Sequence, residues 1–386
     1  MTRIDKYWKR SAAGLLAALM LMAGGRGMNI ESFAMTSKTP FMEEAALQSP
    51  GTLVINDGQA AVQASQDILT PVQIGTDAGQ AQAAAQTGQG AASGGTAQVM
   101  AFGAVSTPVT DSSSLFGAGR LTMYANHDTN AQSLSVIIET GQGGLIVVDG
   151  GWRANAEFLL NQIKQKGGHV QAWLLTHPDT DHIGALADIL YNHSTEITID
   201  GIYYSFHEDS WYAEHDANVA SMVAYTKGAF ANVAPEVLHG DIVSGQVIEA
   251  GPAKIQVLNQ AYKMTNDVTN NSSVAYLVSL NGTNVVFLGD LAKAGGAQLM
   301  ADHDLGALNC DIVQLAHHGQ NGVDFEVYKA LRPSIALWPT PQWLWDNDNG
   351  GGAGSGPWAT LETKNWMVRL GVKTSYCVKD GDQVIE

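Results

Sequence analysis

Cysteine is scarce in this chain, which has only Cys310 and Cys377 among its 386 residues. Neither belongs to a C-x-x-C pair, and two cysteines are too few for a disulfide framework. Both lie in apolar runs typical of strands, so the sequence favours two buried free thiols. A single pairing between them stays open, because disulfides form in exported proteins.

Basic residues are also few: 20 lysines and arginines stand against 37 aspartates and glutamates, a formal net charge of −17. Proteins that grip nucleic acid through its phosphates usually carry a basic face. The acidic balance therefore argues against tight, non-specific binding of DNA or RNA. It does not exclude a nucleic-acid substrate that is held through metal ions.

The N-terminal apolar run, Ala12–Ala23, is shorter than the roughly 20 residues that a bilayer-spanning helix takes. It follows a segment rich in lysine and arginine, and small residues come after it, at Ser32 and Ala34. This order is typical of an export signal. We interpret residues 1–34 as a signal peptide or N-terminal anchor, and we expect the protein to be secreted or anchored at the outer face of the cytoplasmic membrane. Membrane contact would be made only through this segment.

Residues 35–118 lack a sustained apolar period and are rich in alanine, glutamine, glycine, serine and threonine. Such a composition cannot bury enough apolar surface to offset the entropy lost on ordering. We predict a flexible, low-complexity tether here, and a folded domain over residues 119–386. Short strands packing on that domain are the weaker alternative.

The folded domain begins with alternating strand and helix patterns. Two apolar runs, Ser133–Glu139 and Gly144–Asp149, are separated by a glycine-rich turn, which predicts a hairpin of buried strands. Residues Ala154–Lys166 carry apolar residues at helical spacing, and Val170–Thr176 is again strand-like. Strand, helix, strand and helix in succession predict an α/β layer architecture.

The second half of the domain repeats this logic. Strands are predicted over Ile255–Leu258, Val274–Leu280, Asn284–Leu288 and Asp311–Ala316, with a helix over Gly295–Asp302. Polar residues with metal-binding chemistry follow several of these strands directly. Because α/β folds gather their sites at the carboxyl ends of strands, we expect these residues to meet there.

The densest chemical signal is the stretch HPDTDH, which carries four potential metal ligands within six residues: His177, Asp179, Asp181 and His182. A tight turn between a buried strand and a helix places such donors around one small volume. The plain alternative is a solvated acidic turn with incidental histidines, since short motifs often occur by chance.

Further stretches, in order, complete a resemblance to the metallo-β-lactamase superfamily. Besides the HPDTDHIG stretch, the matching segments are Leu145–Gly151 (LIVVDGG), Asn270–Ser273 (NNSS), Val285–Leu291 (VVFLGDL) and Asp311–Gly319 (DIVQLAHHG). Asp179 stands where the family usually has a second histidine. This variant is typical of the hydrolase domain of ComEC-type DNA-uptake proteins and of their free-standing relatives. The resemblance implies an αββα sandwich, in which two mixed β-sheets carry helices on their outer faces.

The resemblance also implies a pair of divalent ions, Zn²⁺ or Mn²⁺. His177 and Asp179 would hold one ion, Asp181, His182 and His317 would hold the other, and Asp290 would bridge them. Imidazole and carboxylate ligands suit zinc, and three aspartates without a thiolate also suit manganese.

Asp181 and His318 are the candidate catalytic residues in this reading. His318 would protonate the leaving group or bind a phosphate oxygen, with a structural hydrogen bond as its alternative role. Asp149 would orient a metal ligand from behind, or merely cap the next turn.

Two aromatic segments lie outside these motifs. The insertion Tyr203–Tyr225 is rich in aromatic and acidic residues and follows the metal motif, where this superfamily places substrate-covering loops; a small subdomain with inward aromatics is the alternative. The segment Trp338–Trp358 holds four tryptophans among carboxylates and glycines. Those tryptophans either form a cage for a cationic head group or pack beneath the loop.

These features favour a metal-dependent hydrolase, most readily a phosphodiesterase that uses metal-activated water on a small-molecule or cell-envelope substrate. An extracellular nuclease is a related alternative, disfavoured by the acidic charge. Amide or lactone hydrolysis, as in β-lactam opening, uses the same chemistry but fits the Asp179 variant less well. A non-catalytic surface protein is the third class, and an intact ligand set argues against it. The chain also departs from its ComEC-type relatives: it lacks their membrane domains, and Gln320 replaces their serine after HHG.

Overall fold

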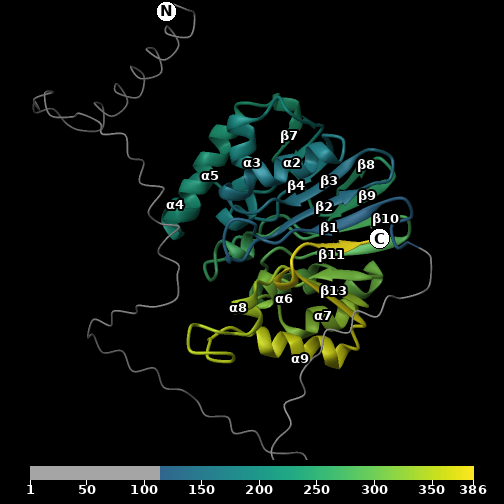
Figure 1. Ribbon diagram of the computed structural model, residues 1–386. Coiled ribbons are helices and arrows are strands. Elements are labelled where there is room, and N and C mark those ends of the chain that lie inside the picture. The colour runs from purple at the N-terminus through teal and green to yellow at the C-terminus, as the bar shows by residue number, and fades with distance from the viewer. Residues whose placement is uncertain (1–113) are drawn as a thin grey trace, which may run out of the picture. The chain divides into compact units, whose positions relative to one another are not determined.

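The computed structural model describes residues 114–386 (Figure 1). The predicted signal segment, and the predicted tether up to residue 113, lie outside the described residues. The backbone of Leu115 donates a hydrogen bond to the carbonyl of the C-terminal Glu386, and Phe116 is buried in the core. The described fold therefore includes residues that precede Gly119.

Two β-sheets form the centre of the fold. The strands of the first sheet, in spatial order, are β15 (Gln383–Ile385), β1 (Arg120–Met123), β2 (Ser135–Glu139), β3 (Leu145–Asp149), β4 (His169–Leu174), β6 (Ile202–Tyr203) and β7 (Leu238–His239), with β5 (Thr198–Ile199) also paired to β4. Those of the second are β14 (Thr374–Cys377), β13 (Ile335–Trp338), β12 (Ile312–Gln314), β11 (Thr283–Phe287), β10 (Tyr276–Leu280), β9 (Ala253–Val257) and β8 (Val247–Ala250).

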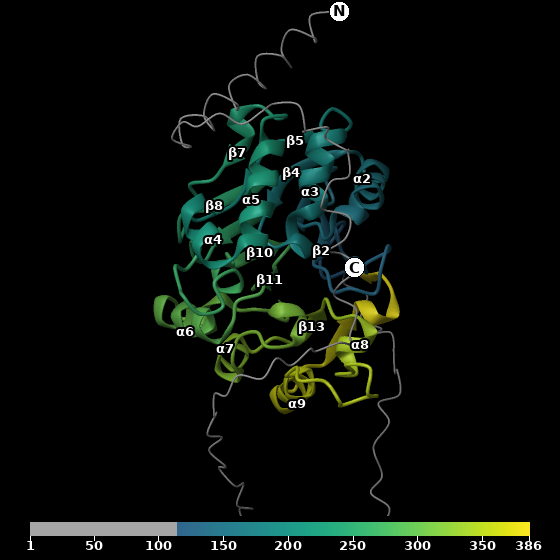
Figure 2. The ribbon, with the colours of Figure 1, turned by 90° about the vertical axis from the view of Figure 1, so that its left-hand side faces the viewer.

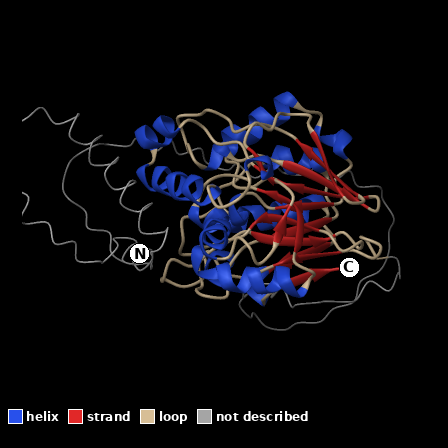
Figure 3. Ribbon diagram, turned by 90° about the horizontal axis from the view of Figure 1, so that it is seen from above, coloured by secondary structure: helices blue, strands red, loops and turns tan. Residues whose placement is uncertain are grey.

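Helices cover the outer face of each sheet. Figures 1 and 2 show one group of helices at one end of the molecule and a second group at the other, and Figure 3 distinguishes helices from strands by colour. The first group is α2 (Ala156–Gln165), α3 (Thr180–Asn192), α4 (Asp209–His215) and α5 (Ala217–Phe230). The second is α6 (Lys293–Asp302), α7 (Phe325–Leu331), α8 (Gln342–Trp345) and α9 (Thr360–Leu370). This is the predicted αββα sandwich, which is confirmed.

The strand sequences explain this layering. Val136 and Ile138 of β2 face the core between the two sheets, whereas Ile137 faces the core beneath α2 and α3. Because successive side chains point to opposite faces, a strand buried on both sides must be apolar at every position. The continuous apolar runs of the sequence are therefore the expected signature of a four-layer fold.

Both sheets are mixed, and their parallel halves position the site. β3, β4, β6 and β7 are parallel neighbours in the first sheet, and β11, β12, β13 and β14 are parallel neighbours in the second. Parallel neighbours end at the same edge, so the residues that follow them are brought together. The predicted gathering of polar residues at strand ends follows from this arrangement.

Short 3-10 turns connect several elements: η4 (Arg153–Asn155), η5 (Pro235–Val237), η6 (Asn270–Ser272), η7 (Leu305–Leu308), η8 (His317–Gly319) and η9 (Val378–Asp380). Within residues 114–386, no helix is both long enough and apolar enough to cross a membrane. Cys310 and Cys377 are buried and free, as the sequence favours, and burial raises the pKa of each thiol to about 12.

The insertion after α3 forms a packed helical pair. Tyr212 of α4 is fully buried against Val219 and Val223 of α5, and Met222 of α5 joins the core beneath the first sheet. An aspartate cap starts α5, since the Asp216 carboxylate accepts hydrogen bonds from the first-turn amides. The alternative of a small subdomain with inward aromatics is the one that the structure shows.

Candidate metal centre

The turn after β4 supplies the first group of donors. His177 is fully buried, and Asp179 caps the N-terminus of α3, where its carboxylate accepts a hydrogen bond from the Thr180 amide at 2.8 Å. Asp181 and His182 follow in the first turn of α3 and are both buried. A helix N-terminus favours nearby carboxylates, so this turn stabilises an acidic cluster that is otherwise costly to bury.

Asp290 lies in the turn that follows β11 of the second sheet, three residues beyond Phe287. Gly289 precedes it with a φ of +55°, and a Cβ atom on that glycine would lie 2.8 Å from the Cβ of Thr176. Only glycine tolerates both this backbone conformation and this close approach. The amide of Asp290 donates a hydrogen bond to the Ser273 hydroxyl at 3.0 Å, which holds the turn in place.

His317 and His318 follow β12 with left-handed backbone conformations, at φ values of 52° and 53°. Such strain in residues other than glycine is typical of functional sites. His318 is fully buried, and its Nδ1 lies 3.1 Å from the carbonyl of Pro339, just beyond β13. The Thr340 hydroxyl donates to the His318 carbonyl at 2.6 Å. The end of β13 therefore anchors the histidine turn.

Four side chains converge on one small volume. His182 Nε2 lies 3.2 Å from Asp290 Oδ2, and His318 Nε2 lies 3.3 Å from the same oxygen and 3.1 Å from Asp181 Oδ2. His177 Nε2 and Asp290 join His182 in a second compact group. The two groups of donor atoms, His177 with His182 and Asp290, and Asp181 with His182 and His318, overlap at His182.

These donors fit a divalent cation. Among residues 114–386, the Nε2 atoms of His177, His182 and His318 and the Oδ1 of Asp290 are buried and make no hydrogen bond of good geometry, although His182 and His318 lie at ion-pair distance from carboxylate oxygens. A buried polar atom left unpaired costs about 1–3 kcal/mol, so a cluster of four calls for an explanation. Imidazole nitrogens and carboxylate oxygens suit zinc, and the carboxylates also suit manganese.

The charges in the centre depend strongly on one another. Burial and the neighbouring His182 lower the pKa of His177 to about 3, which keeps its imidazole neutral and ready to act as a ligand. Burial alone would lower the pKa of His318, but Asp290 and then Asp181 raise it to about 9. Burial would likewise raise the pKa of Asp290, yet His182 and His318 hold it well below its usual range. Protons on these histidines therefore take the place that a bound cation would occupy.

Asp149 lies behind the centre. His182 Nδ1 is 2.7 Å from Asp149 Oδ2, so the carboxylate accepts the Nδ1 proton and leaves Nε2 directed at Asp290. This is the contact expected of a residue that orients a metal ligand, and such outer partners fix the ring and its tautomer.

The structure brings together four of the predicted ligands: His177, Asp181, His182 and Asp290. His318, which was expected as a proton donor, lies beside Asp181 and His182, the position at which His317 was expected as a ligand. His317 is partly exposed, and its ring centroid is 6.1 Å from that of His318. The paired left-handed residues turn the second histidine inward, because the carbonyl of Pro339 holds it there. Asp179 is partly exposed and belongs to neither compact group of donors.

Sequence reasoning missed the residues that support the ligands. Thr176, Pro339 and Thr340 contact the histidines or Asp149, but each lies in an apolar or irregular stretch without a motif of its own. Ser273 was noticed only as part of a resemblance. A hydroxyl directly before His177 is the single local signal that could have pointed to Thr176.

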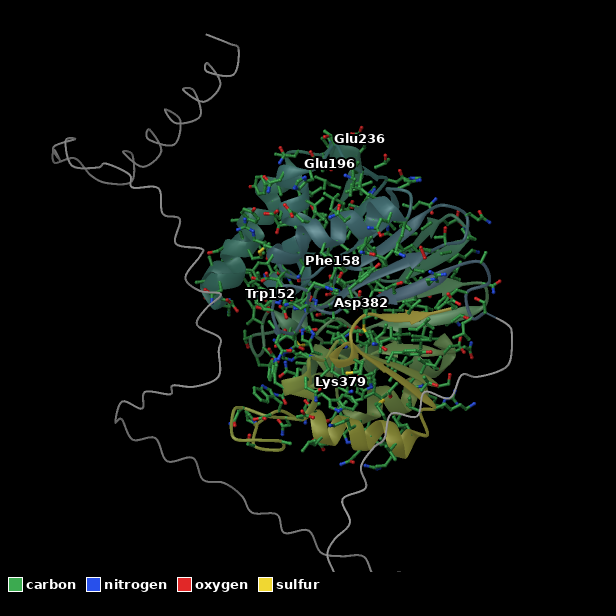
Figure 4. All side chains as sticks on the ribbon, in the orientation of Figure 1. Trp152, Phe158, Glu196, Glu236, Lys379 and Asp382 are labelled. Atoms are coloured by element: carbon green, nitrogen blue, oxygen red, sulfur yellow. The ribbon has the colours of Figure 1, made fainter. Side chains whose placement is uncertain are left out.

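The tryptophans of the C-terminal segment pack rather than form an open cage. Trp338 is 1% exposed, and Trp345 meets it edge to face with ring centroids 5.1 Å apart. Lys364 and Lys379 already lie over the Trp345 ring, at 4.3 and 5.4 Å from its centroid, and Figure 4 labels the second of these lysines. The Trp343 indole donates to the carbonyl of Asn130 at 2.7 Å. Cations of the chain itself therefore occupy the face of Trp345 that a ligand would need, while Trp343 and Trp358 stay partly exposed.

Comparison with known proteins agrees with this geometry. A family model described as the metallo-beta-lactamase superfamily matches residues 128–337. ComE operon protein 3 of Bacillus subtilis (strain 168) is 25% identical over 211 residues, which are 52% of this chain and 25% of that protein. The chain thus corresponds to about a quarter of the length of this curated relative.

Solved structures with a similar arrangement include the metallo-beta-lactamase fold protein YhfI from Bacillus subtilis. It is 13% identical with a TM-score of 0.44, over 69% of this chain and 99% of YhfI. Another is MEM-A1, a subclass B3 metallo-beta-lactamase from a soil metagenome library. It is 17% identical with a TM-score of 0.36, over 53% of this chain and 78% of MEM-A1.

Proposed function

The chain belongs to the metallo-β-lactamase superfamily of metal-dependent hydrolases, and from this premise we propose that it hydrolyses a phosphodiester outside the cytoplasm with two divalent ions. The observation that carries the proposal is the pair of donor groups that overlap at His182, together with Asp290 Oδ2, which lies within 3.3 Å of an Nε2 atom from each group, those of His182 and His318. Five converging side chains are more donors than one tetrahedral ion would use, so His177, Asp181, His182, Asp290 and His318 would hold two ions.

Such a pair of ions, when bound, lowers the pKa of a water molecule to near neutrality and stabilises charge on the attacking and leaving oxygens of a phosphoryl group. The chain's own part is to hold the donors rigidly. Each of the three buried imidazoles presents Nε2 to the centre, and Asp181 and Asp290 supply the negative charge. With an activated water as the nucleophile, the reaction would need no nucleophilic side chain.

His317 and Asp179 are the partly exposed members of the motif. A substrate that reaches the centre from solvent would meet these two side chains before the buried ones. The fully enclosed position of His318 argues against its expected role as proton donor, and His317 takes that role in the proposal. Its ring is partly exposed, although its Nδ1 is buried and has no hydrogen-bond partner within residues 114–386.

The acidic charge supports a small-molecule or cell-envelope substrate over a nucleic acid. With a formal net charge of −17, the chain repels long polyanions at a distance, whereas a single phosphodiester next to a cationic group is drawn in more readily. Export through residues 1–34 would place the enzyme beside envelope substrates. Cell fractionation with an antibody to the folded domain tests that location, and an exclusively cytoplasmic signal would contradict it.

A substrate panel tests the reaction. The purified chain, loaded with Zn²⁺ or with Mn²⁺, is offered bis-p-nitrophenyl phosphate, a phosphocholine ester, single- and double-stranded DNA, and nitrocefin. We expect the small phosphodiesters to be cleaved fastest, and Asp290→Asn to abolish the activity. Glu236→Gln, which changes an exposed carboxylate of η5 (labelled in Figure 4), is the matched control and should act like the unaltered chain. Cleavage of nitrocefin alone would refute the proposal, and DNA as the best substrate would replace it with a nuclease.

A further inference from the structure

The hydroxyl of Thr176 lies at the junction of three groups behind the metal centre. Its Oγ1 is 2.7 Å from Asp149 Oδ2, 3.1 Å from His177 Nδ1 and 3.3 Å from His182 Nδ1. All four side chains are fully buried, so no solvent competes for these contacts. These contacts determine which of the two ring nitrogens carries the hydrogen in His177 and in His182, and to which atom the Thr176 hydroxyl donates.

The proton assignment follows from counting donors. Asp149 accepts at Oδ1 from the Thr176 amide, at 2.8 Å, and at Oδ2 from His182 Nδ1, at 2.7 Å. The hydroxyl of Thr176 has one hydrogen, and a carboxylate is a stronger acceptor than an imidazole nitrogen. The 2.7 Å contact therefore takes the hydroxyl hydrogen, and the Thr176 oxygen is left as an acceptor for His177 Nδ1–H.

We propose that Thr176 is a positioning residue that extends the reach of Asp149 to His177, and so sets which nitrogen of His177 faces the cation. Asp149 orients His182 directly and His177 through the hydroxyl. Both imidazoles then carry hydrogen on Nδ1 and present Nε2, the atoms that are buried without a hydrogen bond of good geometry beside Asp290. One carboxylate thereby controls two ligands on the same turn.

Close packing and a fixed backbone restrict rotation of the Thr176 side chain. Val274 donates to the Thr176 carbonyl at 2.7 Å, and a Cβ atom placed on Gly289 would lie 2.8 Å from the Thr176 Cβ. A β-branched side chain also has few accessible χ1 rotamers. Valine at this position keeps the shape and loses only the hydrogen bonds, which makes Thr176→Val a clean test.

The first experiment uses the metal-free chain, so that it does not depend on the proposed function. Nitrogen-15 spectra of the histidine rings report whether His177 carries its hydrogen on Nδ1 or Nε2. The unaltered chain and Thr176→Ser should show Nδ1–H, and Thr176→Val should show a mixture of both tautomers. Thr226→Val is the matched control, because Thr226 is equally buried but its hydroxyl has no partner within residues 114–386. An unchanged Nδ1–H signal in Thr176→Val overturns the proposal.

The second experiment measures Zn²⁺ affinity by competition with a chelator, and this part rests on the metal-binding half of the proposed function. Loss of an outer partner of a metal ligand weakens binding about 10–100-fold, and we expect that loss for Thr176→Val. Thr176→Ser and Thr226→Val should remain close to the unaltered chain. If Thr176→Val does not fold, Thr176→Ala removes the same hydroxyl without a new methyl group. Absence of metal binding in the unaltered chain would sink the proposed function, while the ring spectra still decide the role of Thr176.

Discussion

Removal of metal should make the stability of this protein fall as the pH rises from 6 to 9. In the metal-free centre, His318 is held protonated by Asp290 and Asp181, which raise its pKa from 6.5 to about 9. A histidine with a raised pKa contributes stability that is complete below pH 6.5 and is lost as the pH passes through 9. His182, whose pKa is also raised, acts in the same direction.

The size of the effect follows from the shift. One unit of pKa corresponds to about 1.4 kcal/mol, so His318 alone accounts for about 3 kcal/mol between pH 6.5 and 9. For a folded region of this size, each kcal/mol moves Tm by about 2–4 °C, which predicts a fall of about 6–12 °C. His177, with a pKa of about 3, is neutral throughout this window, and the lowered pKa of Asp290 matters only in acid.

Calorimetry of the chelator-treated protein at pH 6 and pH 9 measures the fall. Added Zn²⁺ should reverse the trend, because a cation competes with protons for the same donors and stabilises more at high pH. In the metal-free protein, His318→Gln should make Tm depend less on pH. His169→Gln, which alters an exposed histidine paired with Asp200, should leave the pH dependence of Tm unchanged. If the metal-free protein has the same Tm at pH 9 as at pH 6, or a higher one, His318 is not the protonated group that this reasoning assumes.

Three further outcomes are expected. Asp290→Ala should be the most damaging single change: metal content should drop from two ions per chain to at most one, and activity at least 100-fold, or about 2.7 kcal/mol. Elemental analysis and a phosphodiester assay check this, and a variant that keeps most activity would show that the shared ligand is elsewhere. His318→Ala should lose metal, whereas His317→Ala should keep it and lose turnover; the reverse result would restore the ligand set inferred from the sequence. A truncated chain that begins at Ser112 should fold and retain activity, which solubility, circular dichroism and turnover measure, and an inactive product would disprove the tether.

Local sequence was enough for the strands and helices around the motifs and for the cluster of candidate donors that follows β4. The strand before His177 and the helix after Asp179 are short-range features, because a buried strand needs continuous apolar residues and a helix needs an N-cap and an apolar period. Asp290 was assigned through the family resemblance, which identified the aspartate after the strand that became β11. The four-layer sandwich came from a resemblance carried by those motifs, and the alternation of cores along β2 explains it physically.

Tertiary structure alone decided which neighbouring residue faces the centre. His317 and His318 are adjacent and chemically identical, and which of them faces the centre depends on a left-handed turn held by Pro339, which follows β13. The sequence also left Trp345 free to bind a ligand. In the structure, Lys364 of α9 lies over the Trp345 ring. The role of Thr176 arises only where β3 and β4 end side by side and bring Asp149 to its hydroxyl. Local patterns specify the residue types and the strand ends; the direction of each side chain depends on contacts between segments far apart in the chain, which no local pattern contains.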